Sequence, residues 1–129
     1  MTLGRGDAYD GRKGVRDMIK VMMMVKRKPG ISKEEFYDYW KNVHGPLVAK
    51  SIPSLRKYVQ NHFVETPGQE QEGDGIIEIW YDSIEEWQQP KDVDKSTADP
   101  LMEDWAKIAD MSPPKIWVVE EHVIKDEIK

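Results

Sequence analysis

The sequence predicts one α+β domain of the ferredoxin-like kind, a βαββαβ chain whose four strands form one antiparallel sheet. Three observations carry this prediction: four apolar segments of strand length, two longer segments with apolar residues at helical spacing, and their alternation along the chain. A length of 129 residues suits one domain with one hydrophobic core. Residues 1–17 carry four glycines and no apolar periodicity, so we expect a flexible N-terminal segment before a folded domain over residues 18–129.

The first predicted strand covers Met18 to Lys28. Alternation divides its apolar residues into Ile19, Val21, Met23 and Val25 on one face and Met22 and Met24 on the other. Both faces are apolar at the centre, which indicates a strand buried on both sides. Helices can cover one face of the sheet, and we expect a partner subunit to cover the other.

The first predicted helix begins at Ser32, after a turn at Pro29-Gly30. Ser32-x-x-Glu35 is a capping box, in which the serine hydroxyl and the glutamate side chain satisfy free backbone N–H groups. Apolar residues then recur at helical spacing and should face the sheet, namely Phe36, Trp40, Val43 and Leu47. We expect Gly45-Pro46 to bend the chain, which would leave His44 at the C-terminal end of this helix.

The second half of the chain continues the alternation of strands and helices. Further strands are expected at Leu55–Val64, at Ile76–Tyr81 and at Ile116–Ile124. Ser83-x-x-Glu86 is a second capping box and opens a short helix. A longer helix is predicted to begin at Asp99-Pro100, because proline is favoured at the first helical position, and to face inward with Leu101, Trp105 and Ile108.

The composition argues against several classes of protein. The 19 basic residues are outnumbered by 24 acidic ones and are scattered, whereas a nucleic-acid binder normally carries a basic stripe. The absence of cysteine excludes disulfides and thiolate metal sites, and it fits a cytoplasmic protein. No apolar run reaches the ~20 residues of a membrane span. The three histidines lie far apart without close ligand spacing, so we expect no metal site.

His44 is the leading catalytic candidate, with Tyr37 and Trp40 beside it on the predicted helix. Imidazole exchanges protons near neutral pH, so His44 could act as a general acid or base at the mouth of a pocket. The alternative is that His44 only interacts with the carbonyl groups at the end of its helix. The residues alone leave the two readings even.

Several other polar and aromatic residues are candidates for substrate binding. Alternation places Arg56, Tyr58 and His62 on one strand face, where they could bind a carboxylate or enolate oxygen, or equally line the polar edge of the expected dimer. A favourable hairpin register would bring Glu78 opposite His62, most simply as a structural ion pair. Among the tryptophans, Trp105 is the best candidate for the wall of a pocket.

Several motifs together resemble the EthD family, over residues 18–125. They are Lys26-Arg27-Lys28-Pro29-Gly30, Ser32-x-x-Glu35-Phe36, Tyr39-Trp40, His44-Gly45-Pro46-Leu47-Val48, Leu55-Arg56-x-Tyr58-x-x-Asn61-His62 and the segment from Asp104-Trp105 through Asp110. The resemblance implies a dimeric α+β barrel, in which the sheets of two protomers meet across a two-fold axis. It also implies a homodimer, a pocket between sheet and helices, and a small hydrophobic or aromatic substrate handled without a cofactor.

Residues and resemblance together give one leading hypothesis. The protein is expected to be a cofactor-independent oxidoreductase of the oxygenase type, acting in catabolism or secondary metabolism, with His44 moving a proton. A lyase or isomerase, such as a decarboxylase, dehydratase or cyclase, could use the same pocket. A non-catalytic binding protein or an accessory protein for a neighbouring enzyme is the third hypothesis.

Overall fold

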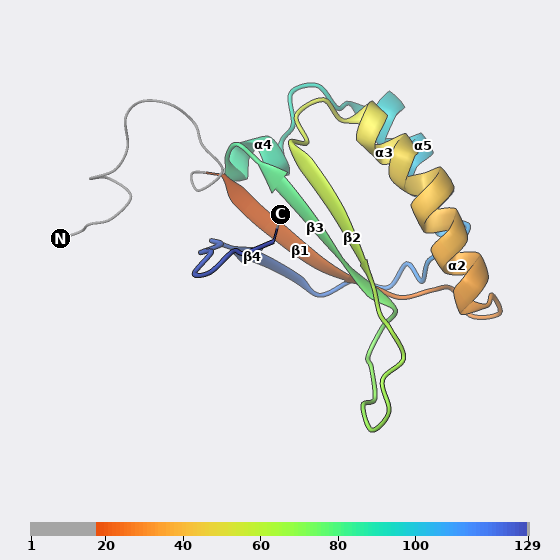
Figure 1. Ribbon diagram of the computed structural model, residues 1–129. Helices are drawn as coiled ribbons and strands as arrows, with labels where there is room; N and C mark the ends of the chain where they lie inside the picture. Colours follow the sequence, from red (N-terminus) through yellow and green to blue (C-terminus); the bar gives the residue numbers. More distant parts are fainter. Residues whose placement is uncertain (1–17, 129) are drawn as a thin grey trace.

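The computed structural model describes residues 18–128, and the expectation of a flexible segment over residues 1–17 lies outside them. The elements follow the predicted βαββαβ order (Figure 1). They are β1 (Ile19–Val25), α2 (Lys33–Tyr39), the π-helical turn η2 (Trp40–His44), α3 (Gly45–Ser51), β2 (Lys57–His62), β3 (Gly75–Tyr81), α4 (Ile84–Gln88), α5 (Lys95–Ala106) and β4 (Ile116–Val119).

The four strands form one antiparallel sheet in the order β2-β3-β1-β4. This order is that of a ferredoxin-like fold and confirms the predicted class. Register places Tyr58 of β2 opposite Ile79 of β3, which in turn lies opposite Val21 of β1. Because side chains alternate along a strand, these residues share one face of the sheet with Gln60 and His62.

The helices α2, α3 and α5 lie together on this face of the sheet (Figure 1). Phe36 and Trp40, both fully buried, anchor the first helix to the core, and their rings lie 5.5 Å apart. Gly75 at the start of β3 makes room for the Trp40 ring, because a Cβ atom there would lie 2.9 Å from the indole. Trp105 of α5 also contacts Trp40, with ring centroids 6.2 Å apart, so the sheet and both long helices meet at Trp40, beside the candidate residues on β2.

The first helix begins as predicted and ends later than predicted. Ser32 and Glu35 form the expected capping box. Gly45-Pro46 does not end the helix, because η2 leads directly into α3 and the proline occupies that helix's first turn, where an N–H is not needed. The wider π-helical turn also moves the inward position from Val43, which is 44 % exposed, to His44, which is buried.

The first two strands are shorter than predicted, at Ile19–Val25 and Lys57–His62, and two boundaries in the second half of the chain differ more. The helix α5 begins at Lys95, capped by the side chain of Asp94, so that Pro100 lies inside it. The last strand, predicted to reach Ile124, ends at Val119, and the residues after it are exposed and lack regular structure. The side chain of Glu121 nevertheless returns to the sheet and accepts a hydrogen bond from Lys20 at 3.0 Å.

The opposite face of the sheet carries charges as well as apolar side chains. Glu78 lies on this face and pairs with Lys20 and Asn61, so the predicted contact between Glu78 and His62 is wrong. The reason is register: Glu78 lies opposite Val59, and His62 opposite Gly75. On β4, Trp117 projects from this same face and is 44 % exposed.

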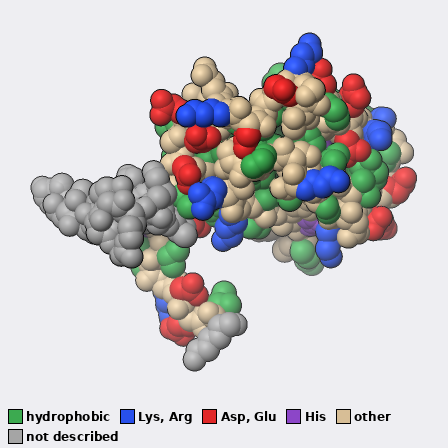
Figure 2. All heavy atoms as spheres, turned by 90° about the horizontal axis from the view of Figure 1, so that it is seen from above, with side chains coloured by type: hydrophobic (Ala, Val, Ile, Leu, Met, Phe, Trp, Pro, Cys, Tyr) green, Lys and Arg blue, Asp and Glu red, His purple; other side chains and the backbone are tan. Residues whose placement is uncertain are grey.

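Acidic and basic side chains are interspersed on the side of the molecule seen in Figure 2. Among the helices of residues 18–128, none combines the length and the apolar character needed to cross a membrane.

Candidate functional site

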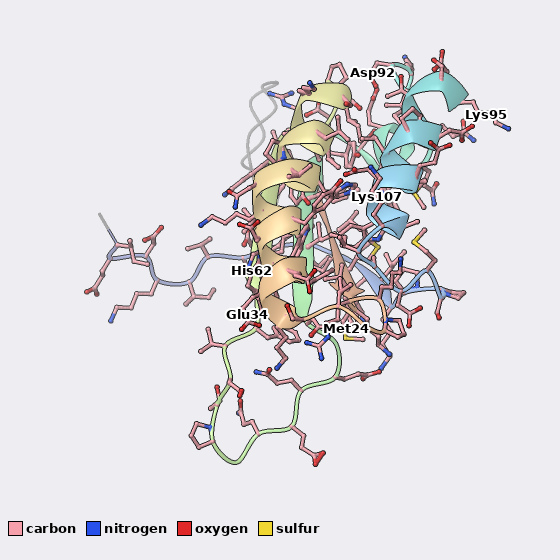
Figure 3. All side chains as sticks on the ribbon, turned by 90° about the vertical axis from the view of Figure 1, so that its right-hand side faces the viewer. Met24, Glu34, His62, Asp92, Lys95 and Lys107 are labelled. Atoms are coloured by element: carbon pink, nitrogen blue, oxygen red, sulfur yellow. The ribbon has the colours of Figure 1, made fainter. Side chains whose placement is uncertain are left out.

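His44 is held from inside the molecule by a carboxylate on the neighbouring helix. Its Nδ1 lies 2.9 Å from Oδ2 of Asp104 on α5, and both side chains are buried. The other carboxylate oxygen of Asp104 accepts a hydrogen bond from the Tyr39 hydroxyl, and Lys107 Nζ lies 3.5 Å from the same oxygen. Figure 3 shows α5 alongside the first helix, with Lys107 at the space between them. A side chain predicted to sit at a helix end therefore belongs to a buried polar cluster.

The charge of Asp104 fixes which nitrogen of His44 carries the proton. Burial by itself raises the pKa of Asp104, but hydrogen bonds from Tyr39 and His44 outweigh it and hold the pKa below its ordinary value. An ionised carboxylate only accepts hydrogen bonds, so Nδ1 of His44 must donate. In the neutral imidazole the lone pair is then on Nε2.

The lone-pair nitrogen of His44 remains within reach of solvent or a ligand. Among the described residues Nε2 has no hydrogen-bond partner, yet none of their buried polar side-chain atoms lacks one, so Nε2 is not sealed in. The Trp105 ring lies 4.9 Å from the imidazole. A carboxylate on one nitrogen and an accessible lone pair on the other is the arrangement of an oriented acid–base histidine.

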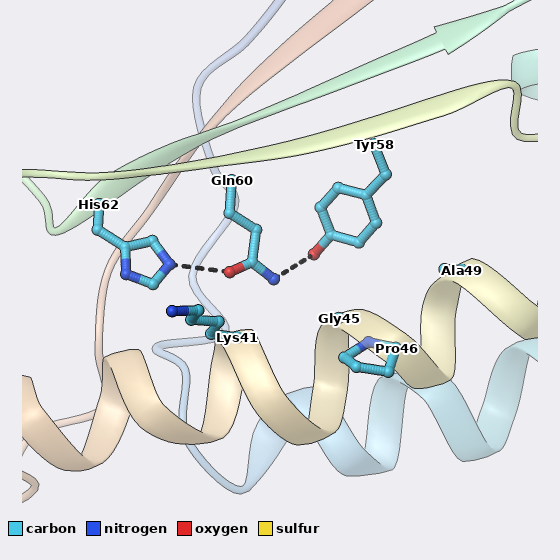
Figure 4. Close-up of a pocket in the computed structure, with 7 residues that line it drawn as sticks. All are labelled: Lys41, Gly45, Pro46, Ala49, Tyr58, Gln60 and His62. Carbon is cyan, nitrogen blue, oxygen red and sulfur yellow. Dashed lines mark hydrogen bonds between the residues drawn. The ribbon is translucent and has the colours of Figure 1, made fainter.

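A second group of side chains surrounds an open cleft between the first helix and strand β2 (Figure 4). The cleft has a volume of about 530 Å³. Its lining consists of Lys41, Gly45, Pro46, Ala49, Tyr58, Gln60 and His62. Gly45 lets the helix approach β2 closely, because a Cβ atom there would lie 2.4 Å from the Gln60 amide nitrogen.

The His62 imidazole is fixed within this cleft by rings and by Gln60. Its plane stacks on Tyr37 and on Trp40, with ring centroids 4.6 Å and 4.5 Å apart. Its Nε2 lies 2.8 Å from the Gln60 amide oxygen. Burial, and secondarily the nearby Lys41 charge, lower the pKa of His62 below its ordinary value, so the ring is neutral at neutral pH.

A separate apolar hollow of about 300 Å³ lies between the sheet and α5. Four methionines and two prolines contribute to its walls, together with Trp105; the methionines are Met23, Met24, Met102 and Met111. Trp105 thus contacts His44 and also borders the hollow. Methionine side chains adapt to irregular apolar ligands, so this lining suits a hydrophobic guest.

The structure divides the substrate-binding residues predicted from the sequence. Tyr58 and His62 line the cleft, and Trp105 lines the hollow. Trp40 is fully buried, and the rings of Tyr37 and Trp40 stack on the His62 imidazole. Arg56 is in neither space, since it precedes β2 and forms an ion pair with Asp82 at 3.2 Å.

Sequence reasoning missed three polar residues of these sites. Asp104 lies on the inward side of α5 with Leu101 and Ile108, and a carboxylate within an apolar stripe signals a buried partner. Lys41 and Gln60 carry no such signal. Within residues 18–128, no group of three or more His, Asp or Glu side chains could hold a metal ion.

Fold and site together define a ferredoxin-like α+β protein with an oriented histidine and two spaces that suit a small molecule. His44 is not among the lining residues of either space, but its neighbour Gly45 lines the cleft and its ring partner Trp105 lines the hollow. The family model for the EthD domain matches residues 28–112, and the chain therefore belongs to the EthD family. No curated protein matches the chain.

Solved structures with a similar fold include another EthD family protein and proteins whose descriptions do not mention EthD. An EthD family protein from Bacillus halodurans is 28% identical, with a TM-score of 0.61 over 81% of this chain and 99% of that one. A dimeric ferredoxin-like protein from Bacteroides fragilis gives a TM-score of 0.58 at 15% identity, over 81% and 97%. SnoaB, a cofactor-independent oxygenase from Streptomyces nogalater, gives 0.53 at 6% identity, over 85% and 99%.

Proposed function

We propose that this EthD protein is an enzyme that moves a proton on a small hydrophobic or aromatic molecule, with His44 as the acid–base residue. The observation that carries the proposal is the 2.9 Å contact between His44 Nδ1 and the buried carboxylate of Asp104. It supplies what a general base needs, namely one nitrogen held as a donor and the other left with its lone pair. Asp104 is a positioning residue in this scheme, because it acts through His44.

The proposed reaction begins when His44 Nε2 accepts a proton from an activated C–H or O–H group of the substrate. The electron pair of the broken bond stays on the substrate as a carbanion, enolate or phenolate. In an oxygenase, dioxygen then accepts electrons from this anion. The fold supports that version, since SnoaB combines a similar fold with cofactor-independent oxygenation. In a lyase or isomerase, the same anion would instead expel a group or be reprotonated at another atom.

Substrate contact is proposed at the apolar hollow beside Trp105 and at the cleft beside Tyr58 and His62. The hollow has the volume range of a small-ligand site and is walled mostly by apolar side chains. Trp105 lines the hollow and its ring centroid lies 4.9 Å from that of His44, so the proposal requires this indole to move when a substrate in the hollow reaches the His44 ring. A homodimer and a cytoplasmic location complete the proposal, in line with the dimeric relative from Bacteroides fragilis.

The test uses His44→Asn, whose amide can still donate to Asp104 but cannot accept a proton. Wild-type protein is incubated in air with a panel of hydroxylated aromatic compounds, with product mass and oxygen uptake as the readouts. We expect a product from wild type and a rate roughly 100- to 10,000-fold lower from the variant. His122→Asn, at a histidine whose side chain is 70% exposed, is the matched control and should keep the full rate.

Three other outcomes have distinct meanings. Product without oxygen uptake would assign the lyase or isomerase alternative to the same dyad. Saturable binding without turnover, in wild type and variant alike, would identify a non-catalytic binding or accessory protein. Full turnover by His44→Asn would refute the role proposed for His44.

A further inference from the structure

The orientation of the Gln60 amide can be derived from its neighbours. The amide nitrogen of Gln60 lies 2.8 Å from the backbone carbonyl oxygen of Trp40, which can only accept a hydrogen bond. The reverse orientation would place two acceptor oxygens at that distance. The amide oxygen of Gln60 therefore faces His62, as Figure 4 shows.

This orientation determines the tautomer of the second histidine. Since the Gln60 oxygen only accepts, Nε2 of His62 must carry the proton in the contact of 2.8 Å. The lone pair of the neutral ring is then on Nδ1, the nitrogen that points away from Gln60 (Figure 4). Stacking on Tyr37 and Trp40 keeps the ring from turning, so this lone pair has a fixed direction.

A cation and an apolar wall complete the surroundings of that lone pair. Lys41, an exposed residue of η2, extends beneath the imidazole in Figure 4 and supplies a positive charge. Pro46 and Ala49 line the same cleft and offer apolar surface to a flat ligand. The volume of about 530 Å³ lies within the usual range for small-molecule sites.

We infer that this cleft is a second proton-accepting site, which takes a ligand with an acidic hydroxyl group, a phenol or an enol, through His62 Nδ1 and Lys41. The O–H bond breaks, its proton forms an N–H bond with Nδ1, and the electron pair stays on the oxygen. The resulting oxyanion is neutralised by the Lys41 ammonium. A carboxylate ligand is disfavoured, because an ionised carboxylate has no proton to donate to Nδ1 and would place an oxygen lone pair against the nitrogen lone pair.

The inference rests on the proposed function only in using the cleft already proposed for substrate contact; it concerns a different proton acceptor, His62 in place of His44. The probe is 4-nitrophenol, whose phenolate absorbs visible light and whose phenol does not. At a pH below the pKa of the free probe, we expect wild-type protein to produce a saturable rise in phenolate absorbance. Benzoate should compete with the probe about ten-fold more weakly, in the concentration needed for half displacement, than phenols of similar size that do not absorb visible light.

Two lysine variants locate the signal. Lys41→Met should weaken probe binding roughly three-fold, the effect of one exposed charge pair. Lys95→Met removes an exposed charge at the start of α5, far from His62 in Figure 3, and should change nothing. Absence of the phenolate signal in wild type, an equal effect of the two variants, or benzoate binding as tight as phenol binding would each overturn the inference.

A second measurement does not depend on any variant. Correlation of imidazole ¹⁵N and ¹H resonances in wild-type protein at neutral pH should identify Nδ1 as the unprotonated nitrogen of His62. A dominant Nδ1–H tautomer, or a ring protonated on both nitrogens, would overturn the inference. His44→Asn should leave the phenolate signal unchanged, so loss of turnover there and loss of probe binding here are separable results.

Discussion

Replacing Asp104 with asparagine tests the polar cluster between the two long helices. The carboxylate accepts hydrogen bonds from His44 and from Tyr39, and both donors point at it from the first helix. Asparagine has nearly the same shape but offers only one oxygen, and its amide N–H₂ would face a second donor. One charge-assisted hydrogen bond is therefore lost, which should lower the free energy of unfolding by about 1.5–3 kcal/mol.

Urea denaturation followed by tryptophan fluorescence measures this loss at a fixed protein concentration. The midpoint for Asp104→Asn should fall with little change in slope, and the melting temperature should drop by roughly 5–12 °C. Glu103→Gln is the matched control, since Glu103 is the exposed neighbour of Asp104 on the same helix, and it should stay within about 0.5 kcal/mol of wild type.

The difference in the free energy of unfolding between wild type and Asp104→Asn should depend on pH, in the direction set by the lowered pKa of Asp104. Because its pKa in the folded protein lies below the ordinary value, the ionised carboxylate stabilises the fold. That stabilisation is complete above the unfolded-state value of about 4 and is lost as the pH falls through the lower folded-state pKa. The gap between wild type and variant should therefore narrow in acid. Equal stability at neutral pH, or a gap that widens in acid, would refute the reasoning.

Three further predictions concern the helix, the assembly and the metal content. Gly45→Ala should destabilise the protein by about 1–3 kcal/mol in denaturation, because the new Cβ would lie 2.9 Å from the backbone carbonyl oxygen of Trp40, which cannot move aside as the Gln60 side chain can, and a more stable variant would contradict the packing described. Light scattering at micromolar concentration should give a dimer mass, and Trp117→Lys, on the sheet face opposite α2, α3 and α5 (Figure 1), should shift it toward the monomer; a monomeric wild type would count against the barrel assembly. Elemental analysis should find no stoichiometric iron or zinc, whereas a metal lost on His44→Ala would overturn that expectation.

Local signals in the sequence were sufficient to predict most of the fold. The serines at positions 32 and 83 cap helices as their spacing predicts, and alternation in β1 separates the two faces of the sheet. Errors arose where packing outweighs local preference. Gly45-Pro46 is a helix breaker by propensity, yet the π-helical turn before it continues into α3. Such a turn depends on contacts with β2 that no local pattern records.

The candidate site was harder to predict because its contacts span long stretches of chain. His44 and Asp104 are 60 residues apart, and only the pairing of two helices brings them together. The sequence showed no partner for the His44 imidazole, whereas in the structure Asp104 orients it. For His62, the face of the strand was predictable, but its partner Gln60 follows from register and from the Trp40 carbonyl. The alternation of residues along a strand predicts which face a side chain occupies. The tautomer of a histidine can be assigned only when the atoms that contact its ring nitrogens are known.

The most direct test of the central claim is the ratio of kcat/KM between wild type and His44→Asn on the first compound that wild-type protein converts. We expect a ratio of roughly 100 to 10,000, with a folded variant that still binds the compound. For Asp104→Asn we expect an intermediate loss of kcat/KM, because that variant weakens the orientation of His44 without removing the imidazole. A ratio near one for His44→Asn, in a correctly folded variant, would contradict the claim that His44 moves the proton.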